Sequence, residues 1–371
     1  MFYKKFLISN IMKIVHINWS LAFGGIETML INIANGQADK GHEVYVIIVN
    51  TYEDTLINTF NRNVNVILLK RKRQSYSISF LFRIDRILRT VHPDVVHLHS
   101  SRLYYAILSQ KMRKRTYYTL HALPHGNMKF GFIHNMFPLL KIRTNSNVAG
   151  CDKVKQIFAI SQAVHDNLIK NYKQESIVIP NGVLTSNFNK RPQVLFKTQL
   201  HIVQVSRLDH QSKGQDLLIE AASKLKGKVK IDFIGDGDSQ DFLINLAKNL
   251  KVEKYVNFLG KQSQDYIAKT LCNYDLFVQA SRWEGFGLTV AEAMAAQVPV
   301  LVASGQGPAE VTCNDKYGWV FENGNSEDLQ KQIVMLMNNY NEAIVKAKLA
   351  KQYVDDTYDV SVTVDKYLAN Y

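Results

Sequence analysis

The chain of 371 residues is 46% hydrophobic and 21% charged, as expected of a globular protein with about two domains. It has no apolar run of the roughly 20 residues that a membrane span needs, and the run Phe6–Ile8 is too short for a signal peptide. Three scattered cysteines, Cys151, Cys272 and Cys313, lack the spacing of a disulfide framework or a zinc site. We therefore expect a cytoplasmic protein without a structural metal.

Residues 1–11 are predicted to be an N-terminal tail, after which a regular alternation begins. Short aliphatic runs alternate with amphipathic stretches, which is the pattern of a parallel sheet covered by helices. The strands predicted in the first half are Lys13–Asn18, Glu43–Val49, Val64–Leu69, Asp94–His99, Thr116–Leu120, Gln156–Ile160 and Ser176–Ile179. Helices are expected between them, notably Ile26–Asp39 and Ser161–Asn171.

The same alternation restarts after residue 200. The strands predicted there are His201–Val205, Val229–Ile234, Val256–Leu259, Leu276–Gln279 and Val300–Val302. A polar stretch after Pro180–Val183 predicts a linker. We therefore predict an α/β fold with two Rossmann-like, doubly wound domains facing across a cleft, at 12–185 and 186–355, followed by helical residues 356–371.

The positive charge is confined to the first half. Residues 1–198 carry 27 Lys and Arg against 10 Asp and Glu, a net +17, whereas residues 199–371 carry 18 against 22, a net −4. The densest clusters are Lys70–Arg73, the arginines 83, 86 and 89, and Lys111–Arg115. One such cluster is commonly a solvated face, but three in one half favour an anionic partner.

In doubly wound sheets, ligands bind beyond the carboxyl ends of the strands, so the segments that follow the strands are candidate sites. Gly24 and Gly25 follow the first strand and precede a helix, where backbone amides suit phosphate or hydroxyl groups. They lack the Gly-x-Gly-x-x-Gly spacing of a dinucleotide site, which argues against NAD.

Two cations, Arg207 and Lys213, follow the strand His201–Val205. A guanidinium and an ammonium on one loop could hold a diphosphate and neutralise it without a metal. Either could instead be an ordinary surface charge.

Two glutamates, Glu284 and Glu292, flank a glycine-rich turn that leads into a helix. The amides at that helix start also suit phosphate. The alternative is that Glu284 is a helix cap and Glu292 a solvated side chain. Because Arg207 and Lys213 are expected on a neighbouring loop, we favour a ligand site.

His121 follows the strand Thr116–Leu120, where an imidazole could bind a sugar hydroxyl or move a proton. A lone histidine is more often structural, but its place at a strand end favours the cleft. His97 and His99 alternate along another strand. Because no Asp, Glu or Cys completes a ligand set with them, we interpret both as structural.

These residues together resemble the GT-B glycosyltransferases, specifically the retaining family GT4, also called glycosyltransferase group 1. The resemblance runs nearly end to end. It is carried by Gly24-Gly25, Ala159–Ser161, Ile179–Val183, Ser206–Leu208, Lys213-Gly214 and, as the most specific motif, Glu284-Gly-Phe-Gly-Leu-Thr-Val-Ala-Glu292. One departure is the segment Ala122–Gly126, which is acidic in much of the family and not here.

The resemblance implies a role for each candidate. Arg207 and Lys213 would hold the donor diphosphate, Glu292 the ribose hydroxyls, and Glu284 the transferred sugar. The segment Phe286-Gly287-Leu288 would bring backbone amides to the sugar and phosphate, and His121 would contact the donor sugar. Gly24 and Gly25 would close on donor and acceptor, and residues 356–371 would return to the first domain as a helix.

We therefore predict a retaining glycosyltransferase that moves a hexose or N-acetylhexosamine from a UDP- or GDP-sugar to a lipid-linked glycan in bacterial surface polysaccharide synthesis. The basic first half predicts peripheral attachment to the inner face of the plasma membrane, with no metal or other cofactor and no nucleic acid partner. The alternatives are a nucleotide-sugar epimerase or phosphorylase of the same fold, or a polyanion- or lipid-binding protein whose enzyme site has decayed.

Overall fold

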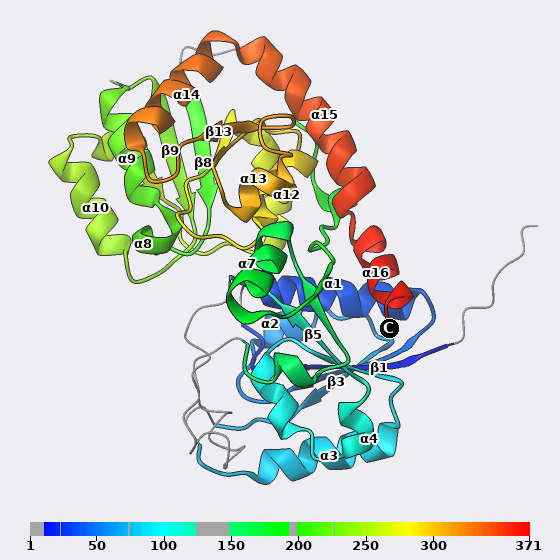
Figure 1. The fold of residues 1–371 in the computed structure, drawn as a ribbon. Helices are drawn as coiled ribbons and strands as arrows, with labels where there is room; N and C mark the ends of the chain where they lie inside the picture. Colours follow the sequence, from blue (N-terminus) through cyan, green and yellow to red (C-terminus); the bar gives the residue numbers. More distant parts are fainter. Residues whose placement is uncertain (1–10, 23, 73–74, 124–147, 193–198, 226) are drawn as a thin grey trace, which may run out of the picture. The chain divides into compact units, whose positions relative to one another are not determined.

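The computed structural model describes residues 11–22, 24–72, 75–123, 148–192, 199–225 and 227–371 (Figure 1). The predicted tail lies outside these residues except for Ile11, and so does Pro124–Gly126. The chain divides into two compact units, described separately below. Unit 1 comprises Met1–Ala159, Asn167–Ile179 and Val364–Tyr371, and unit 2 comprises Ile160–Asp166 and Pro180–Thr363.

The described part of unit 1 is built on a parallel sheet in the order β3-β2-β1-β4-β5-β6-β7. All seven strands predicted for this half are present. Their bounds are β1 (Lys13–Asn18), β2 (Glu43–Ile48), β3 (Val64–Leu68), β4 (Val95–Leu98), β5 (Thr116–Leu120), β6 (Gln156–Ala159) and β7 (Ile177–Val178). The chain runs outward from β1 to β3 and then returns to β4 on the other side of β1. The order therefore reverses between β1 and β4.

Unit 2 has a second parallel sheet, in the order β10-β9-β8-β11-β12-β13 among the described residues. The bounds are β8 (Leu200–Val205), β9 (Val229–Ile234), β10 (Val256–Phe258), β11 (Leu276–Gln279), β12 (Val300–Ala303) and β13 (Trp319–Phe321). The sequence predicted the first five and missed β13, because three residues at a sheet edge carry too little pattern. Here the strand order reverses between β8 and β11.

Helices cover both faces of each sheet, which explains the nearly continuous apolar runs of the strands. In unit 1, α1 lies on one face and α3 and α4 on the other (Figure 1). In unit 2, α9, α10 and α14 pack on one face, and α12 and α13 lie on the other. The helices concerned are α1 (Gly25–Asp39), α2 (Asp54–Ile57), α3 (Ser79–Val91), α4 (Gln110–Arg113), α7 (Gln162–Tyr172), α8 (His210–Lys213), α9 (Gln215–Lys224), α10 (Gln240–Asn249), α11 (Gln264–Thr270), α12 (Leu288–Ala295), α13 (Gly307–Val311), α14 (Ser326–Asn338), α15 (Tyr340–Tyr358) and α16 (Val360–Ala369). These sheets and helices confirm the predicted pair of Rossmann-like domains.

The end of the chain belongs to the core of unit 1. The ring of Tyr367 packs edge-on against Phe158 of β6, and the ring of Tyr371 does so against Tyr117 of β5. The predicted domain bounds at residues 185 and 355 stay a prediction. No helix in the described ranges combines the length and apolar character of a membrane span.

Candidate functional site

The predicted site residues fall into two groups. Unit 1 holds Gly24, Gly25 and His121, whereas unit 2 holds Arg207, Lys213, Glu284, Phe286, Gly287, Leu288 and Glu292. In unit 2 they follow β8 and β11, the two strands between which the strand order reverses. This is where ligands bind in open α/β sheets.

The loop after β8 is held in place by its own short helix. Asp209 caps α8 by accepting a hydrogen bond from the backbone of Ser212, and its other carboxylate oxygen pairs with the exposed Arg207 at 3.0 Å. Gly214 ends α8 with φ of +65°. A Cβ atom there would lie 2.0 Å from the carbonyl oxygen of Ala280, so this close approach requires glycine. Lys213 is thereby fixed beside the end of β11.

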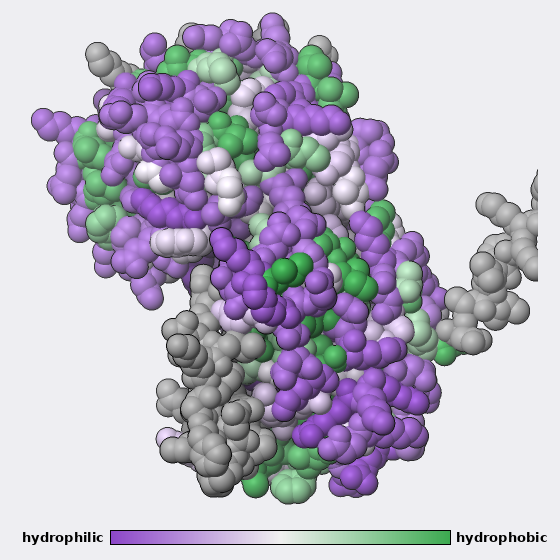
Figure 2. Space-filling view, in the orientation of Figure 1, coloured by the Kyte–Doolittle hydropathy of each residue, from purple (hydrophilic) through white to green (hydrophobic). Residues whose placement is uncertain are grey.

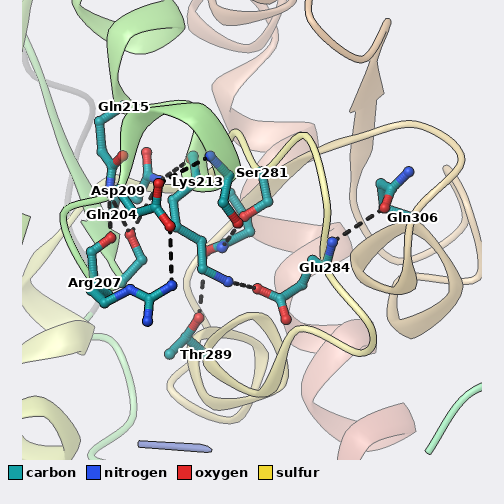
Figure 3. A network of polar contacts seen from close by, with 12 residues as sticks. Gln204, Arg207, Asp209, Lys213, Gln215, Ser281, Glu284, Thr289 and Gln306 are labelled. Carbon is teal, nitrogen blue, oxygen red and sulfur yellow. Dashed lines mark hydrogen bonds and ion pairs between the residues drawn. The ribbon is translucent and has the colours of Figure 1, made fainter. Parts of the chain in front are cut away.

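Lys213 and Glu284 form an ion pair, so the structure brings two predicted ligand-binding residues into direct contact (Figure 3). The Lys213 Nζ donates to Glu284 Oε2 at 2.5 Å, and the two side chains are only 18% and 22% exposed. The backbone of Glu284 is held by Gln306, whose side-chain oxygen accepts from its N–H at 3.2 Å. A partly buried carboxylate and ammonium are therefore preorganised at this sheet edge.

The turn Gly285–Leu288 brings backbone close to backbone. A Cβ on Gly307 would lie 2.5 Å from the carbonyl group of Gly285, and Gly287 has φ of +95° where α12 begins. Gly287, not Glu284, is the N-cap, so the cap interpretation of Glu284 is wrong. The side chain of Phe286 is buried against Tyr358, which leaves its backbone as the part available to a ligand. The amides of Val290 and Ala291 donate to the carbonyl of Gly287 at 3.0 and 3.3 Å, whereas those of Leu288 and Thr289 have no carbonyl four residues earlier within the helix.

Glu292 is buried on α12, and the solvated interpretation of this residue is wrong. Its side chain is 3% exposed and accepts a hydrogen bond from Gln264 of α11 at 2.6 Å. Burial raises the pKa of Glu292 to about 7, and the bond from Gln264 offsets part of that effect. A carboxyl group with a pKa near neutral pH and one hydrogen bond from Gln264 can still accept hydrogen bonds from ligand hydroxyls.

Three functional candidates in unit 2 escaped the sequence analysis: Asp209, Gln264 and Gln306. Asp209 contacts Arg207, Gln264 contacts Glu292, and Gln306 contacts Glu284. Gln264 and Gln306 are far in the sequence from the residues that they contact, and Asp209 belongs to no motif. Arg282 was also missed, although it contacts none of the predicted residues: its guanidinium binds both oxygens of Asp216, at 2.9 and 2.7 Å. That fork ties the β11 loop to α9.

In unit 1, Gly24 and Gly25 stand where the sequence predicted, at the start of α1. Gly24 is the N-cap in extended backbone, and no side chain caps the helix there. A Cβ on Gly24 would meet the carboxylate of Glu27 at 2.7 Å. Burial raises the pKa of Glu27.

His121 directly follows β5, and its Nε2 atom shares a hydrogen bond with Nδ1 of His99 at 3.1 Å. Burial lowers the pKa of His121 to about 3, so the ring is neutral at pH 7. Such a ring is a poor proton shuttle at neutral pH. Of the two predicted roles, hydrogen bonding to a ligand is the one its surroundings support.

Two family models match adjoining parts of the chain. The one for glycosyl transferases group 1 matches residues 186–353, and the one for glycosyltransferase family 4 matches residues 23–187. Together they cover every strand of the two sheets except β1.

Similar proteins are found among curated sequences and solved structures. An uncharacterized glycosyltransferase of Methanocaldococcus jannaschii is 26% identical, over 85% of this chain and 85% of its own length. The phosphatidylinositol N-acetylglucosaminyltransferase gpi3 subunit of Schizosaccharomyces pombe is 25% identical, over 92% of this chain and 77% of its own. The crystal structure of HepE from Anabaena, in complex with UDP and glucose, matches with a TM-score of 0.78 at 24% identity, over 97% of this chain and 98% of that one.

Proposed function

This chain belongs to the group 1 glycosyltransferases of the GT-B fold, and on that premise we propose that it moves a hexose or N-acetylhexosamine from a UDP- or GDP-sugar to a lipid-linked glycan. The proposed outcome is retention of configuration. The proposed pathway is bacterial surface polysaccharide synthesis, such as that of capsule, exopolysaccharide or lipopolysaccharide, at the inner face of the plasma membrane.

The observation that carries the donor half of the proposal is the Lys213–Glu284 pair between the ends of β8 and β11. The ammonium supplies positive charge for a diphosphate, with the exposed Arg207 on the same loop. The carboxylate of Glu284 supplies an acceptor for sugar hydroxyls, and the first turn of α12 offers backbone amides. Glu292, further along the same helix, is the proposed acceptor for the ribose hydroxyls.

The proposed reaction uses charge and not a covalent enzyme intermediate. The bond between the sugar C1 and the diphosphate oxygen breaks while the acceptor oxygen adds to the same face of C1. The leaving diphosphate takes the proton of the acceptor hydroxyl. Lys213 and Arg207 stabilise the charge that develops on the diphosphate, so the proposal requires no metal. The structure of HepE of Anabaena in complex with UDP-glucose, a protein of the same fold, supports the choice of donor class.

The proposal is tested by a thermal-shift panel of UDP- and GDP-sugars, because a donor that binds the folded state raises the melting temperature. We expect one donor at a hundredfold excess over its Kd to stabilise the protein by about 2.7 kcal/mol. The same donor should release UDP or GDP when acceptor is added. Conversion of UDP-glucose without acceptor would instead indicate an epimerase, and phosphate-dependent cleavage of a glycan would indicate a phosphorylase. No shift with any nucleotide sugar would leave only a binding protein.

The proposed acceptor side is the basic surface around α3 in unit 1. Ile78, Phe82 and Arg86 follow at helical spacing and are all exposed. Arg83 donates to the carbonyl of Leu69 at 2.6 Å, which brings the basic residues after β3 beside this helix. Figure 2 shows apolar side chains at the lower edge of the molecule, where Figure 1 draws α3.

An anionic lipid surface is the partner that fits this combination. Lipid headgroups attract the cations, and the apolar side chains insert at the interface. The lipid acceptor in the name of the fission yeast relative, phosphatidylinositol, supports an acceptor of this class.

We expect the protein to sediment with phosphatidylglycerol vesicles at low salt and not with phosphatidylcholine vesicles. Arg86→Glu should weaken this binding roughly thirtyfold, because the side-chain charge changes by two at about 1 kcal/mol each. The control is Arg62→Glu, the same change of charge at an exposed residue. Arg62 precedes β3, whereas α3 contacts the residues that follow β3. Equal binding to both kinds of vesicle, or an equal loss in both variants, would contradict membrane attachment through α3.

A further inference from the structure

Four histidines of unit 1 lie close together at the carboxyl ends of neighbouring strands. His16 is on β1 and stands opposite His97 of β4 in the parallel register. His99 follows β4 and His121 follows β5. His16, His97 and His99 are buried. The sequence predicted His97 and His99 to be structural, and it gave no sign that His16 and His121 would join them.

Three of these rings link into one chain of hydrogen bonds that ends at the last residue. His121 Nε2 lies 3.1 Å from His99 Nδ1, and His99 Nε2 lies 3.1 Å from His16 Nδ1. His16 Nε2 then lies 2.8 Å from Gln37 Oε1. The amide nitrogen of Gln37 donates to the hydroxyl of Tyr371 at 3.2 Å.

The fourth ring, His97, branches off the same chain. Its Nδ1 lies 2.6 Å from the Tyr371 hydroxyl, and its Nε2 lies 2.7 Å from Thr119 Oγ1. Thr119 in turn bonds the hydroxyl of Tyr367 at 3.0 Å. Both nitrogens of this ring are therefore occupied.

A metal ion is a poor occupant of this cluster, although ligand atoms of His16, His97 and His99 lie within 4.8 Å of one another. An ion has to lie in the plane of each ring that binds it, because the nitrogen lone pair lies in that plane. The rings of His97 and His99 are stacked, with centroids 4.7 Å apart and planes 19° apart. One ion cannot lie in two stacked planes, and both nitrogens of each of the three rings are already hydrogen-bonded to protein groups.

The order of the bonds determines which nitrogen of each ring carries the proton. Burial lowers the pKa of His16 to about 4, and the pKa of His99 is lowered by burial and by its histidine neighbours. A neutral imidazole has one donor and one acceptor nitrogen. Gln37 Oε1 can only accept, so His16 donates through Nε2 and accepts through Nδ1. The donor to His16 Nδ1 is His99 Nε2, so His99 accepts through its Nδ1. The donor to His99 Nδ1 is in turn His121 Nε2.

His121 therefore donates through Nε2 and has an acceptor at Nδ1. That Nδ1 atom is buried and has no hydrogen-bond partner among the described residues. An unfilled acceptor costs less than a buried unpaired N–H would, which is consistent with this direction of the chain.

We propose that Gln37 and Tyr371 act through this histidine chain as positioning residues that hold His121 as a hydrogen-bond acceptor, so that its Nδ1 binds a hydroxyl of the sugar ligand. The sugar ligand rests on the proposed function, whereas the direction of the chain does not. Such an acceptor selects ligands that present an O–H at this point and disfavours those that present only an acceptor.

The test is nitrogen NMR of ¹⁵N-histidine-labelled protein without ligand, in which the shifts of the two ring nitrogens report the tautomer. The His121 signals are identified by their absence from His121→Asn. We expect a single His121 tautomer, protonated at Nε2. In Tyr371→Phe the amide of Gln37 loses the partner that orients it, so both tautomers of His121 should appear in comparable amounts.

Tyr367→Phe is the matched control, because it removes a buried hydroxyl from α16, four residues before Tyr371. That hydroxyl bonds Thr119 and not Gln37, so His121 should keep one tautomer while the melting temperature falls as in Tyr371→Phe. A proton on Nδ1 of His121 in the parent protein overturns the proposal. So does an equal change of tautomer in both variants. The NMR measurement uses no nucleotide sugar. Its result can therefore be interpreted even if no nucleotide sugar shifts the melting temperature.

Discussion

Replacing Lys213 by methionine is expected to lower kcat/KM for the sugar donor by about a thousandfold. In the proposed site the change removes a charge that stabilises the diphosphate, and loss of one preorganised electrostatic group in an active site costs about 10² to 10³ in rate. It also leaves the partly buried carboxylate of Glu284 unpaired, which adds to the cost. The measurement is the initial rate of nucleotide release at varied donor concentration.

Lys224→Met is the matched control, because it makes the same change in an ion pair of the same unit. Lys224 pairs with Glu327 at 3.0 Å, and these side chains are 45% and 72% exposed. Exposed pairs contribute little, so kcat/KM should stay within about twofold of the parent protein. If Lys213→Met retained a tenth of the parent kcat/KM, the Lys213–Glu284 pair would be structural and the donor would bind elsewhere.

Donor affinity is expected to rise about tenfold between pH 6 and pH 8 and to level off above, because of Glu292. Its pKa of about 7 means that the free enzyme is mostly protonated at this residue at pH 6 and mostly ionised at pH 8. In the proposed site the ribose hydroxyls donate to this carboxylate, so the ionised form should bind the donor more tightly, and affinity should fall as the pH drops through that pKa. Calorimetric titration with the donor found by the thermal-shift panel measures the effect.

Glu292→Gln keeps the shape of the side chain and removes its ionisation. At pH 8 this variant should bind the donor roughly tenfold to a hundredfold more weakly, the usual cost of a hydrogen bond to a charged group. Its affinity should no longer change with pH. A pH dependence that survives in the variant would show that another group titrates, and Glu292 would then not be the ribose acceptor.

The arrangement of strands was predictable because parallel strands covered on both faces read as short apolar runs. Both sheets and the position of the loops after β8 and β11 followed from that pattern. The contact of Lys213 with Glu284 could be expected only in outline, since strand order determines which loops meet but not which side chains pair. The strand β13 was missed because its three residues are too few to show a pattern.

Burial and long-range register could not be predicted. Whether Glu292 faces solvent or the core depends on how α12 is rotated against α11, and the eight residues of that helix are too few to show it. The histidine chain depends on residues from β1 to the last residue, with Gln37 and Tyr371 separated by 334 positions. Local patterns contain no information on such a contact.

The backbone of the last residue also matters for how the protein is handled. The carbonyl of Tyr371 accepts a hydrogen bond from the hydroxyl of Tyr117 at 2.8 Å. A purification tag fused after this residue would start beside this contact and close to the hydroxyl that accepts from Gln37. We therefore prefer a tag before residue 1 for every assay above.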